Sequence, residues 1–383
     1  MKNRREFLKN TSKLAVGGII GASIAQNLMA DSRTLPRKDS LTDSSNTQSK
    51  TDSHTSQVKS QNKGKIMNKK VVVIGSTGHI GTYLVPMLVE NGFEVIGISR
   101  GKSPPYEANK AFDKITKITL DRTKEPDFAT KIAALNADVI VDLINFHIDD
   151  TIKMVKALKN ISHYLFCSSI WAHGRARELP SDPNSTTKAP LDEYGIQKFK
   201  SEMYLKEQFK KSGFPASIIM PGQISGAGWL IINPWGNLNV KIFEKIARGE
   251  EISLPNWGME TLHHVHAYDV AQMFFKAIMH RDCALGESFH AVAKQSLSLY
   301  GYAEMMYEYF NKTPKISFLS WEKWCEYEGN KEEIDHTYFH IARSGHYSIE
   351  NAQRLIDYKP KYSTQETIKI AIESYIKRGI IKV

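Results

Sequence analysis

The chain of 383 residues has only 3 cysteines, Cys167, Cys283 and Cys325, which are far apart and odd in number. This pattern excludes a disulfide framework and offers no metal-ligand spacing, so we expect no metal site. The sequence also lacks an uninterrupted apolar run of the ~20 residues that a membrane span needs. Apolar residues make up 41% and charged residues 24%, which is typical of a globular protein and argues against a membrane bundle or a disordered chain.

The positive charge is concentrated at the front of the chain. The formal net charge is +10, and residues 1–65 carry 12 Lys and Arg against 5 Asp and Glu. The remaining residues carry 39 against 36, which is close to balance. A body so near neutrality has little attraction for a phosphate backbone, so we expect no nucleic-acid partner.

The first residues resemble a twin-arginine export signal. Arg4–Lys9 reads Arg-Arg-Glu-Phe-Leu-Lys, and a short apolar run broken by glycines follows from Leu14 to Ala25. We expect residues 1–30 to be a signal peptide, cleaved after Ala25 or Ala30, with an uncleaved anchor as the alternative. The resemblance implies the export machinery as a partner, and a periplasmic or otherwise extracytoplasmic mature protein that does not associate with the membrane.

Residues 31–66 are expected to be a linker. The stretch 31–65 contains 13 Ser and Thr and no aromatic residue, so it cannot bury enough apolar surface to offset the entropy of ordering. The folded body is therefore expected to span residues 67–383.

The body opens with a strand, a glycine-rich turn and a helix. Val71–Ile74 is wholly apolar, Gly75-Ser-Thr-Gly78-His-Ile-Gly81 follows, and apolar periodicity continues to Glu90. This order predicts the phosphate-binding start of a doubly wound parallel α/β (Rossmann) fold, with the pyrophosphate at the helix N-terminus. The cofactor contacts expected here are Gly75, Ser76, Thr77, Gly78, His79, Ile80 and Gly81.

The next strand predicts the type of dinucleotide. Phe93–Ile98 reads as a strand, and the segment Ser99–Lys102 directly after it offers Arg100 and Lys102 but no acidic residue. An acid would accept from the ribose 2′-hydroxyl of NAD, whereas an arginine suits the 2′-phosphate of NADP, so we favour NADP, with NAD as the alternative. Asp121, after a strand over Lys117–Leu120, is a candidate for the adenine edge. Further buried strands are expected over Val139–Leu143 and Tyr164–Ser168.

Tyr194 and Lys198 are the candidate catalytic pair. Four residues apart on a helix, their side chains share one face. A lysine ammonium beside a phenol stabilises the phenolate, which can then exchange a proton with a hydroxyl or carbonyl group during hydride transfer to or from nicotinamide. Ser169 follows a buried strand and precedes Tyr194 by 25 residues, where its hydroxyl could hydrogen-bond the reacting oxygen.

Together these residues resemble the extended short-chain dehydrogenase/reductase family, the NAD-dependent epimerase/dehydratase group, over residues 69–383. Further segments match the family in order, including Met220–Gly228, Val265–Ala271 and Ser348–Pro360. The resemblance implies a Rossmann fold with a smaller C-terminal substrate-binding subdomain, mainly 220–266 and 286–346. It also implies a homodimer paired through the Tyr–Lys helix. The site residues that it implies are Ser169 (rather than Ser168), Tyr194 and Lys198 as catalytic triad, and Leu143 and Pro221 as further cofactor contacts.

Two departures from the family pattern concern the substrate. Met220 stands where the family usually has arginine, and Leu262 stands where an arginine usually grips a nucleotide-sugar diphosphate. An apolar side chain cannot bind a diphosphate, so a UDP- or GDP-sugar is disfavoured. Substrate contacts are instead expected from aromatic, amide and imidazole side chains between 226 and 266, namely Trp229, Asn237, His263 and His264.

These observations predict an exported NAD(P)-dependent epimerase or oxidoreductase that acts on a hydroxyl or carbonyl carbon of a small sugar-like substrate. Epimerisation returns its hydride and needs no external pool to recharge the cofactor, which suits an extracytoplasmic enzyme. The alternatives are a net NADPH-dependent ketone reductase and a non-catalytic nucleotide-binding or redox-sensing protein on the same fold. An RNA-binding relative of the fold is a further alternative, disfavoured by the near-neutral body.

Overall fold

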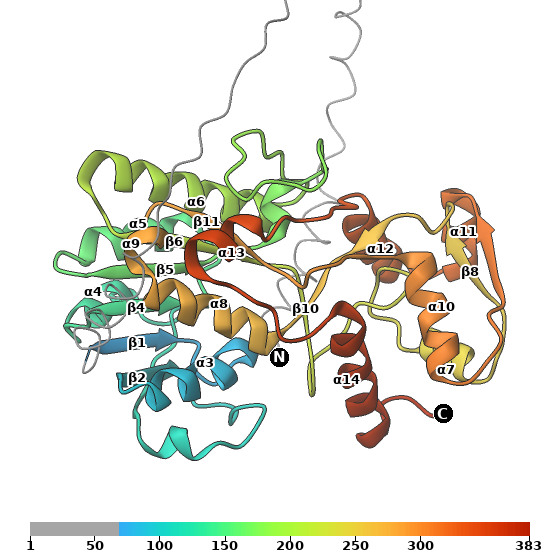
Figure 1. Cartoon of the computed structure of the whole chain (residues 1–383), viewed down its shortest axis with the longest axis horizontal. Helices are drawn as coiled ribbons and strands as arrows, with labels where there is room; N and C mark the ends of the chain where they lie inside the picture. Colours follow the sequence, from blue (N-terminus) through green and yellow to red (C-terminus); the bar gives the residue numbers. More distant parts are fainter. Residues whose placement is uncertain (1–68) are drawn as a thin grey trace, which may run out of the picture. The chain divides into compact units, whose positions relative to one another are not determined.

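The computed structural model describes residues 69–383, which belong to one compact unit running from Met67 to Val383. Its centre is a 7-stranded sheet in the order β11-β6-β5-β4-β1-β2-β3 (Figure 1), and every pair of neighbouring strands in it is parallel. The strands are β1 (Lys70–Ile74), β2 (Glu94–Ser99), β3 (Thr116–Thr119), β4 (Val139–Asp142), β5 (His163–Cys167), β6 (Ala216–Pro221) and β11 (Ser288–Ala291). The predicted signal peptide and linker lie outside the described residues.

Helices cover both faces of this sheet. On one face α4, α5 and α6 pack in succession, and on the other α3 and α8 pack together beside α9 and α13. The bounds are α3 (His79–Glu90), α4 (Phe128–Ala133), α5 (Ile148–Ala157), α6 (Glu193–Ser212), α8 (Ala267–Met279), α9 (Arg281–Ala284) and α13 (Glu350–Ile356), with 3₁₀ turns η1 (Lys110–Asp113) and η2 (Ile170–His173). The doubly wound α/β fold that the sequence predicts is confirmed. A parallel sheet covered on both faces needs strands with mainly apolar residues, and the interiors of β1, β4 and β5 meet that demand.

A second, smaller part is built on three short strand pairs: β7 with β10, β9 with β12, and β8 with β13. Its strands are β7 (Gln223–Ser225), β8 (Ile252–Pro255), β9 (Thr261–Leu262), β10 (His264–His266), β12 (Leu297–Ser298) and β13 (Ile316–Leu319). Its helices are α7 (Lys241–Ala247), α10 (Leu299–Tyr309), α11 (Trp321–Glu328), α12 (Lys331–Ile341) and α14 (Thr364–Lys377).

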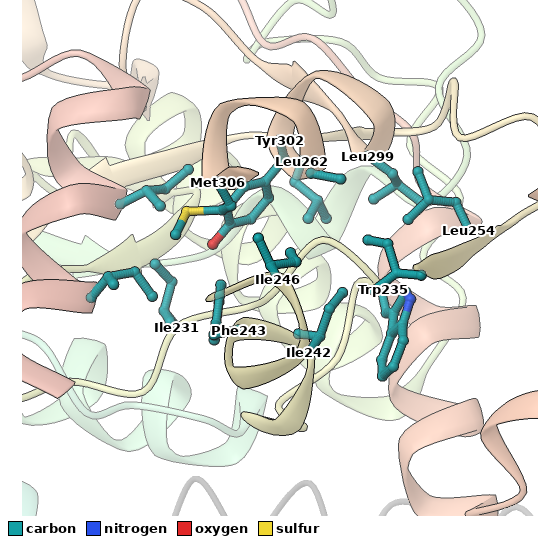
Figure 2. Close-up of a cluster of buried hydrophobic side chains, with 14 of the residues drawn as sticks. Ile231, Trp235, Ile242, Phe243, Ile246, Leu254, Leu262, Leu299, Tyr302 and Met306 are labelled. Carbon is teal, nitrogen blue, oxygen red and sulfur yellow. The ribbon is translucent and has the colours of Figure 1, made fainter. Parts of the chain in front are cut away.

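This smaller part has a hydrophobic core of its own. Figure 2 shows side chains of α7 and α10, such as Phe243 and Met306, packed against Trp235 and Leu262. Trp324 of α11 is fully buried in the same cluster. No helix within residues 69–383 combines the length and apolar character needed to cross a membrane.

The topology brings the loops after β1 to β6 to one edge of the sheet. In parallel α/β sheets, ligands bind outside the carboxyl ends of the strands. The predicted glycine turn and the residues after each following strand therefore face the same region.

Candidate active site

The turn between β1 and α3 has the shape that a pyrophosphate needs. Gly75 has φ +95°, a left-handed conformation that glycine adopts without strain. A Cβ on Gly81 would lie 2.3 Å from the backbone oxygen of Ser76, so only glycine lets the helix approach the turn this closely. No side chain caps the first amide groups of α3, and no acid lies in its first turn. This cradle fits a dinucleotide phosphate at the positive end of the helix.

The predicted ribose and adenine contacts follow the neighbouring strands. Arg100 is partly buried directly after β2, Lys102 is exposed two residues further on, and Asp121 lies after β3. The pKa of the Asp121 carboxyl group is lowered. Slight burial of the group acts to raise this pKa, but hydrogen bonds from Thr123 and the positive charge of the nearby Arg100 outweigh that effect. Leu143 is buried after β4, with its amide donating 3.1 Å to Ile74 at the end of β1.

Lys198 is held at the carboxyl ends of β4 and β5. Its side chain comes from α6, only 1% of the residue is exposed, and its Nζ donates to the backbone oxygens of Asn145 and Cys167, each at 2.6 Å. The ammonium lies 5.5 Å from the centre of the Tyr194 ring on the same helix. A buried ammonium is thus fixed beside a phenol before any ligand binds.

Ser169 caps the 3₁₀ turn η2, and η2 packs against α6. Its Oγ accepts from the amide of Trp171 at 3.2 Å, at the N-terminus of η2. The Trp171 ring packs edge-on against Tyr194 with centroids 5.8 Å apart, and Phe146 lies on another side of Tyr194 at 6.3 Å. The structure therefore gathers the three predicted catalytic residues in one place. Ser168, the neighbouring hydroxyl, is buried with no hydrogen-bond partner for its Oγ among residues 69–383.

Asn145 anchors Lys198 to a buried polar cluster that sequence reasoning missed. Its Nδ2 donates to Thr151 Oγ1 at 3.1 Å and lies 3.4 Å from Asp142 Oδ2. Asp142 is fully buried at the end of β4, where Arg122 binds it at 2.6 Å. The carbonyl that accepts from Lys198 is therefore part of a rigid element.

Trp229 lies at the glycine turn. Its ring stacks on His79, the first residue of α3, with centroids 4.8 Å apart and planes at 16°, and its edge meets Tyr106 at 5.5 Å. The segment after β7 thus places Trp229 against the first residue of α3, beside the phosphate cradle. Pro221 ends β6, the strand next to β5 in the sheet.

Three predicted substrate contacts are buried and bonded within the fold. Asn237 is fully buried, and its Nδ2 donates to Thr337 Oγ1 at 3.1 Å. His263 Nε2 bonds the Ala293 carbonyl at 2.7 Å, and His264 Nε2 bonds the Ile232 carbonyl at 3.0 Å. Burial lowers the pKa of His263 to about 3 and that of His264 to about 4, so both are neutral near pH 7. These bonds account for the three side chains as parts of the fold.

The segment after α12 contributes a site residue that no short motif indicated. The Arg343 side chain is 3% exposed, and its Nη2 lies 3.2 Å from Oδ1 of Asp192, the residue that caps α6. Its guanidinium also covers the Trp171 ring, with Cζ 3.8 Å from the centroid. Asp192 could have been found as an N-cap signal before an amphipathic helix. Arg343 is about 150 residues away in the chain, and only the fold connects the two.

Leu262, which replaces an expected arginine, belongs to the apolar core of Figure 2 and is 1% exposed. In the part of the chain that the structure describes, no group of three His, Cys, Asp or Glu side chains could hold a metal ion.

Fold and site together define a Rossmann-type enzyme of the dehydrogenase kind. The model of the NAD dependent epimerase/dehydratase family matches residues 71–290. The chain belongs to this family of NAD-dependent enzymes, as the sequence predicted.

Relatives and solved structures add detail. A chloroplast stem-loop binding protein of 41 kDa from Arabidopsis thaliana is 24% identical over 82% of this chain and 81% of its own length. The 2'-dehydrokanamycin reductase of Streptomyces kanamyceticus is 28% identical over 42% of this chain and 44% of its own. A UDP-glucuronic acid 4-epimerase from Bacillus cereus, solved with UDP-glucuronic acid and NAD, has a TM-score of 0.60 at 16% identity, over 81% of this chain and 99% of that one. This last likeness is one of fold.

Proposed function

We propose that this protein is an exported NADP-dependent epimerase that inverts a hydroxyl-bearing carbon of a sugar-like substrate. The observation that carries the proposal is the buried Lys198 ammonium, 5.5 Å from the Tyr194 ring and fixed at the carboxyl ends of β4 and β5. The match to the epimerase/dehydratase family and a relative named as a reductase support the reaction class.

Each side chain has a distinct task in this proposal. Tyr194 takes the proton of the substrate hydroxyl and gives it back, because the Lys198 charge favours its phenolate form. Ser169 turns its O–H toward the substrate oxygen, since its lone pair already accepts from the Trp171 amide. A bound nicotinamide supplies the acceptor and donor of hydride. Trp171 and Phe146 pack against the Tyr194 ring and hold it in position.

The preference for NADP rests on Arg100. Its position directly after β2 suits a 2′-phosphate, and Asp121 is near enough to compete for the same charge. If Arg100 holds the phosphate, Arg100→Ala should weaken NADP binding about tenfold and leave NAD binding unchanged, as measured by calorimetry. An equal loss for both cofactors would contradict the assignment.

Export and epimerisation support one another. The Arg4–Lys9 segment and the apolar run behind it favour export of the folded protein, and a redox-neutral cycle needs no cofactor pool outside the cytoplasm. The same reasoning favours a tightly held cofactor. Mass spectrometry of protein purified from its native compartment should therefore detect bound NADP or NAD.

The decisive experiment combines that analysis with three variants. Tyr194→Phe should abolish turnover of sugar substrates while cofactor binding remains. Ser169→Ala should lower turnover, whereas Ser168→Ala serves as its matched control one residue away. The proposal fails if the protein retains no nicotinamide cofactor and gains no thermal stability from added NADP. A greater loss in Ser168→Ala than in Ser169→Ala would move the hydroxyl role to the neighbour.

Two other functions have specific support. Steady consumption of NADPH with a ketone substrate would indicate a net reductase, in line with the relative named 2'-dehydrokanamycin reductase. The chloroplast relative is named for stem-loop binding and matches most of the chain, which favours an RNA-binding test. Binding of stem-loop RNA that is lost as salt rises, with no effect of Tyr194→Phe, would support that function instead.

A further inference from the structure

A buried guanidinium reaches the start of the catalytic helix from a distant part of the chain. Arg343 follows α12, and its side chain lies between Asp192 and the face of Trp171, at 3.2 Å and 3.8 Å respectively. Its Nη1 also donates to the backbone oxygen of Phe339. These contacts lock the guanidinium in one position.

Tyr194 belongs to the same cluster. Trp171 contacts both side chains, through its face to Arg343 and edge-on to the Tyr194 ring at 5.8 Å. Burial lowers the pKa of Arg343, and attraction to Asp192, Tyr347 and Tyr194 opposes that change. An arginine remains protonated under such a shift. Arg343 and Tyr194 therefore interact electrostatically within a cluster in which Arg343 and Trp171 are buried.

We propose that Arg343 is a second cation acting on Tyr194, which favours the phenolate together with Lys198, and that Asp192 sets the strength of this effect. The inference rests on the proposed function, in which Tyr194 is the acid/base group. Arg343 is a positioning residue, because it acts through Tyr194.

The charges around Tyr194 determine whether a change at each residue favours or disfavours the phenolate. The Lys198 ammonium lies 5.5 Å from the Tyr194 ring on the same helix, whereas Arg343, from the smaller part of the structure, covers the Trp171 ring that packs against Tyr194. Asp192 cancels part of the Arg343 charge, and a positive charge in a low-dielectric site favours the nearby anion. Removing Arg343 therefore disfavours the phenolate, and removing the Asp192 charge favours it.

Other titratable groups lie on the elements around Tyr194, and several of them form hydrogen bonds with residues other than Tyr194. Glu193 is exposed and accepts from Gln197 at 2.7 Å. His173 bonds His290 at 2.8 Å, and its burial lowers its pKa well below the usual value, so it stays neutral. The groups on these elements include Asp192, Glu193 and Lys198 at α6, His147, Asp149 and Asp150 at the start of α5, His173 in η2, and His340, Arg343 and Tyr347 around the end of α12.

The pH dependence of kcat/KM tests the proposal, because substitutions of Arg343 and of Asp192 should shift it in opposite directions. Arg343→Gln should move the acidic limb of the profile up by about one pH unit, a tenfold loss at a fixed acidic pH, and Arg343→Lys should restore most of it. Asp192→Asn should move the limb down, because asparagine still caps α6 through Gly195 but leaves the Arg343 charge unopposed. The double variant should lie between the two.

A second readout is independent of turnover. Ultraviolet difference titration of tyrosinate, taken as wild type minus Tyr194→Phe, should show the same opposite shifts in the protein without added substrate. A structural role alone would not give opposite signs from two partners of one ion pair. The proposal is overturned if Arg343→Gln folds and keeps the wild-type profile, or if Asp192→Asn shifts the limb in the same direction.

The outcomes separate this inference from the proposed function. If Arg343→Gln does not fold, Asp192→Asn decides alone, and an unchanged titration overturns the inference. If no sugar substrate is turned over and Tyr194→Phe is without effect, the proposed function fails. The tyrosinate titration then still tests the coupling between Arg343 and Tyr194.

Discussion

Replacing Lys198 by methionine should separate the electrostatic role of the ammonium from its structural one. The side chain is buried, and methionine fills a similar volume without charge. Two buried carbonyls, of Asn145 and Cys167, lose their 2.6 Å donor, at about 1–3 kcal/mol each. Burying an ammonium is itself costly, and that cost disappears in the variant. We therefore expect a net loss of about 2 kcal/mol in stability and a folded protein.

The loss of activity should be much larger than the loss of stability. Without the ammonium the phenol is an unassisted acid, and a free phenol ionises near pH 10. Turnover by Lys198→Met should fall about 10²- to 10⁴-fold at neutral pH and recover as pH rises. The assay is kcat/KM against pH, with Lys200→Met, exposed two residues away, as the matched control. Wild-type turnover at neutral pH, or a loss equal at every pH, would refute the reasoning.

Three further predictions concern stability and cofactor binding. Lys188 and Glu202 form an ion pair at 2.6 Å, with side chains 0% and 1% exposed. Lys188→Met should therefore lower the free energy of unfolding by about 3 kcal/mol, as measured by urea unfolding. The control Lys211→Met, in an exposed ion pair, should leave the melting temperature unchanged. Gly81→Ala should weaken cofactor binding at least about tenfold in calorimetry, because the added Cβ meets the backbone of the turn. Burial lowers the pKa of His163 to about 3 in the folded protein, whereas an unfolded histidine has a pKa of about 6.5. Because only the unfolded state takes up this proton as the pH falls below about 6.5, the free energy of unfolding should fall there by up to about 1.4 kcal/mol per pH unit. Unfolding measured at pH 7 and pH 5 should be less pH-dependent in His163→Gln, and an unchanged pH dependence would contradict that origin.

The fold was predictable because its central strands β1, β4 and β5 are mainly apolar. The predicted strands over Val139–Leu143 and Tyr164–Ser168 differ from β4 and β5 by one residue at the ends. The glycine turn was predictable too, since its spacing meets a steric requirement that only glycine fulfils. Such local constraints are visible in a short window of sequence.

The roles of the histidines were not predictable in the same way. His263 and His264 look like ligands in a sequence, because imidazoles near a substrate segment can bind hydroxyl groups. In the structure their rings satisfy carbonyls of Ala293 and Ile232, which lie about 30 residues away along the chain. Long-range hydrogen bonds leave no periodic signal.

The aromatic residues also divide into those whose position was predictable from the sequence and those whose position was not. Trp324 lies at helical spacing from Trp321, a pattern typical of a core residue, and it is fully buried in the core. Trp229 was predicted to contact substrate, but its position against His79 depends on how the segment after β7 crosses the sheet edge. Spacing along one helix predicts burial, whereas the partner of a loop residue depends on the tertiary fold.

The core in Figure 2 is assembled from chain segments that leave and re-enter the nucleotide-binding part. Ile231 to Leu262 come before α8 and β11, Leu299 to Ile341 come after them, and Ile368 to Ile381 close the set. No single cut frees this smaller part, so it cannot be exchanged between proteins as a cassette. New substrate preferences in this chain would have to arise by point substitution or by changes in loop length, with the dinucleotide-binding sheet retained throughout.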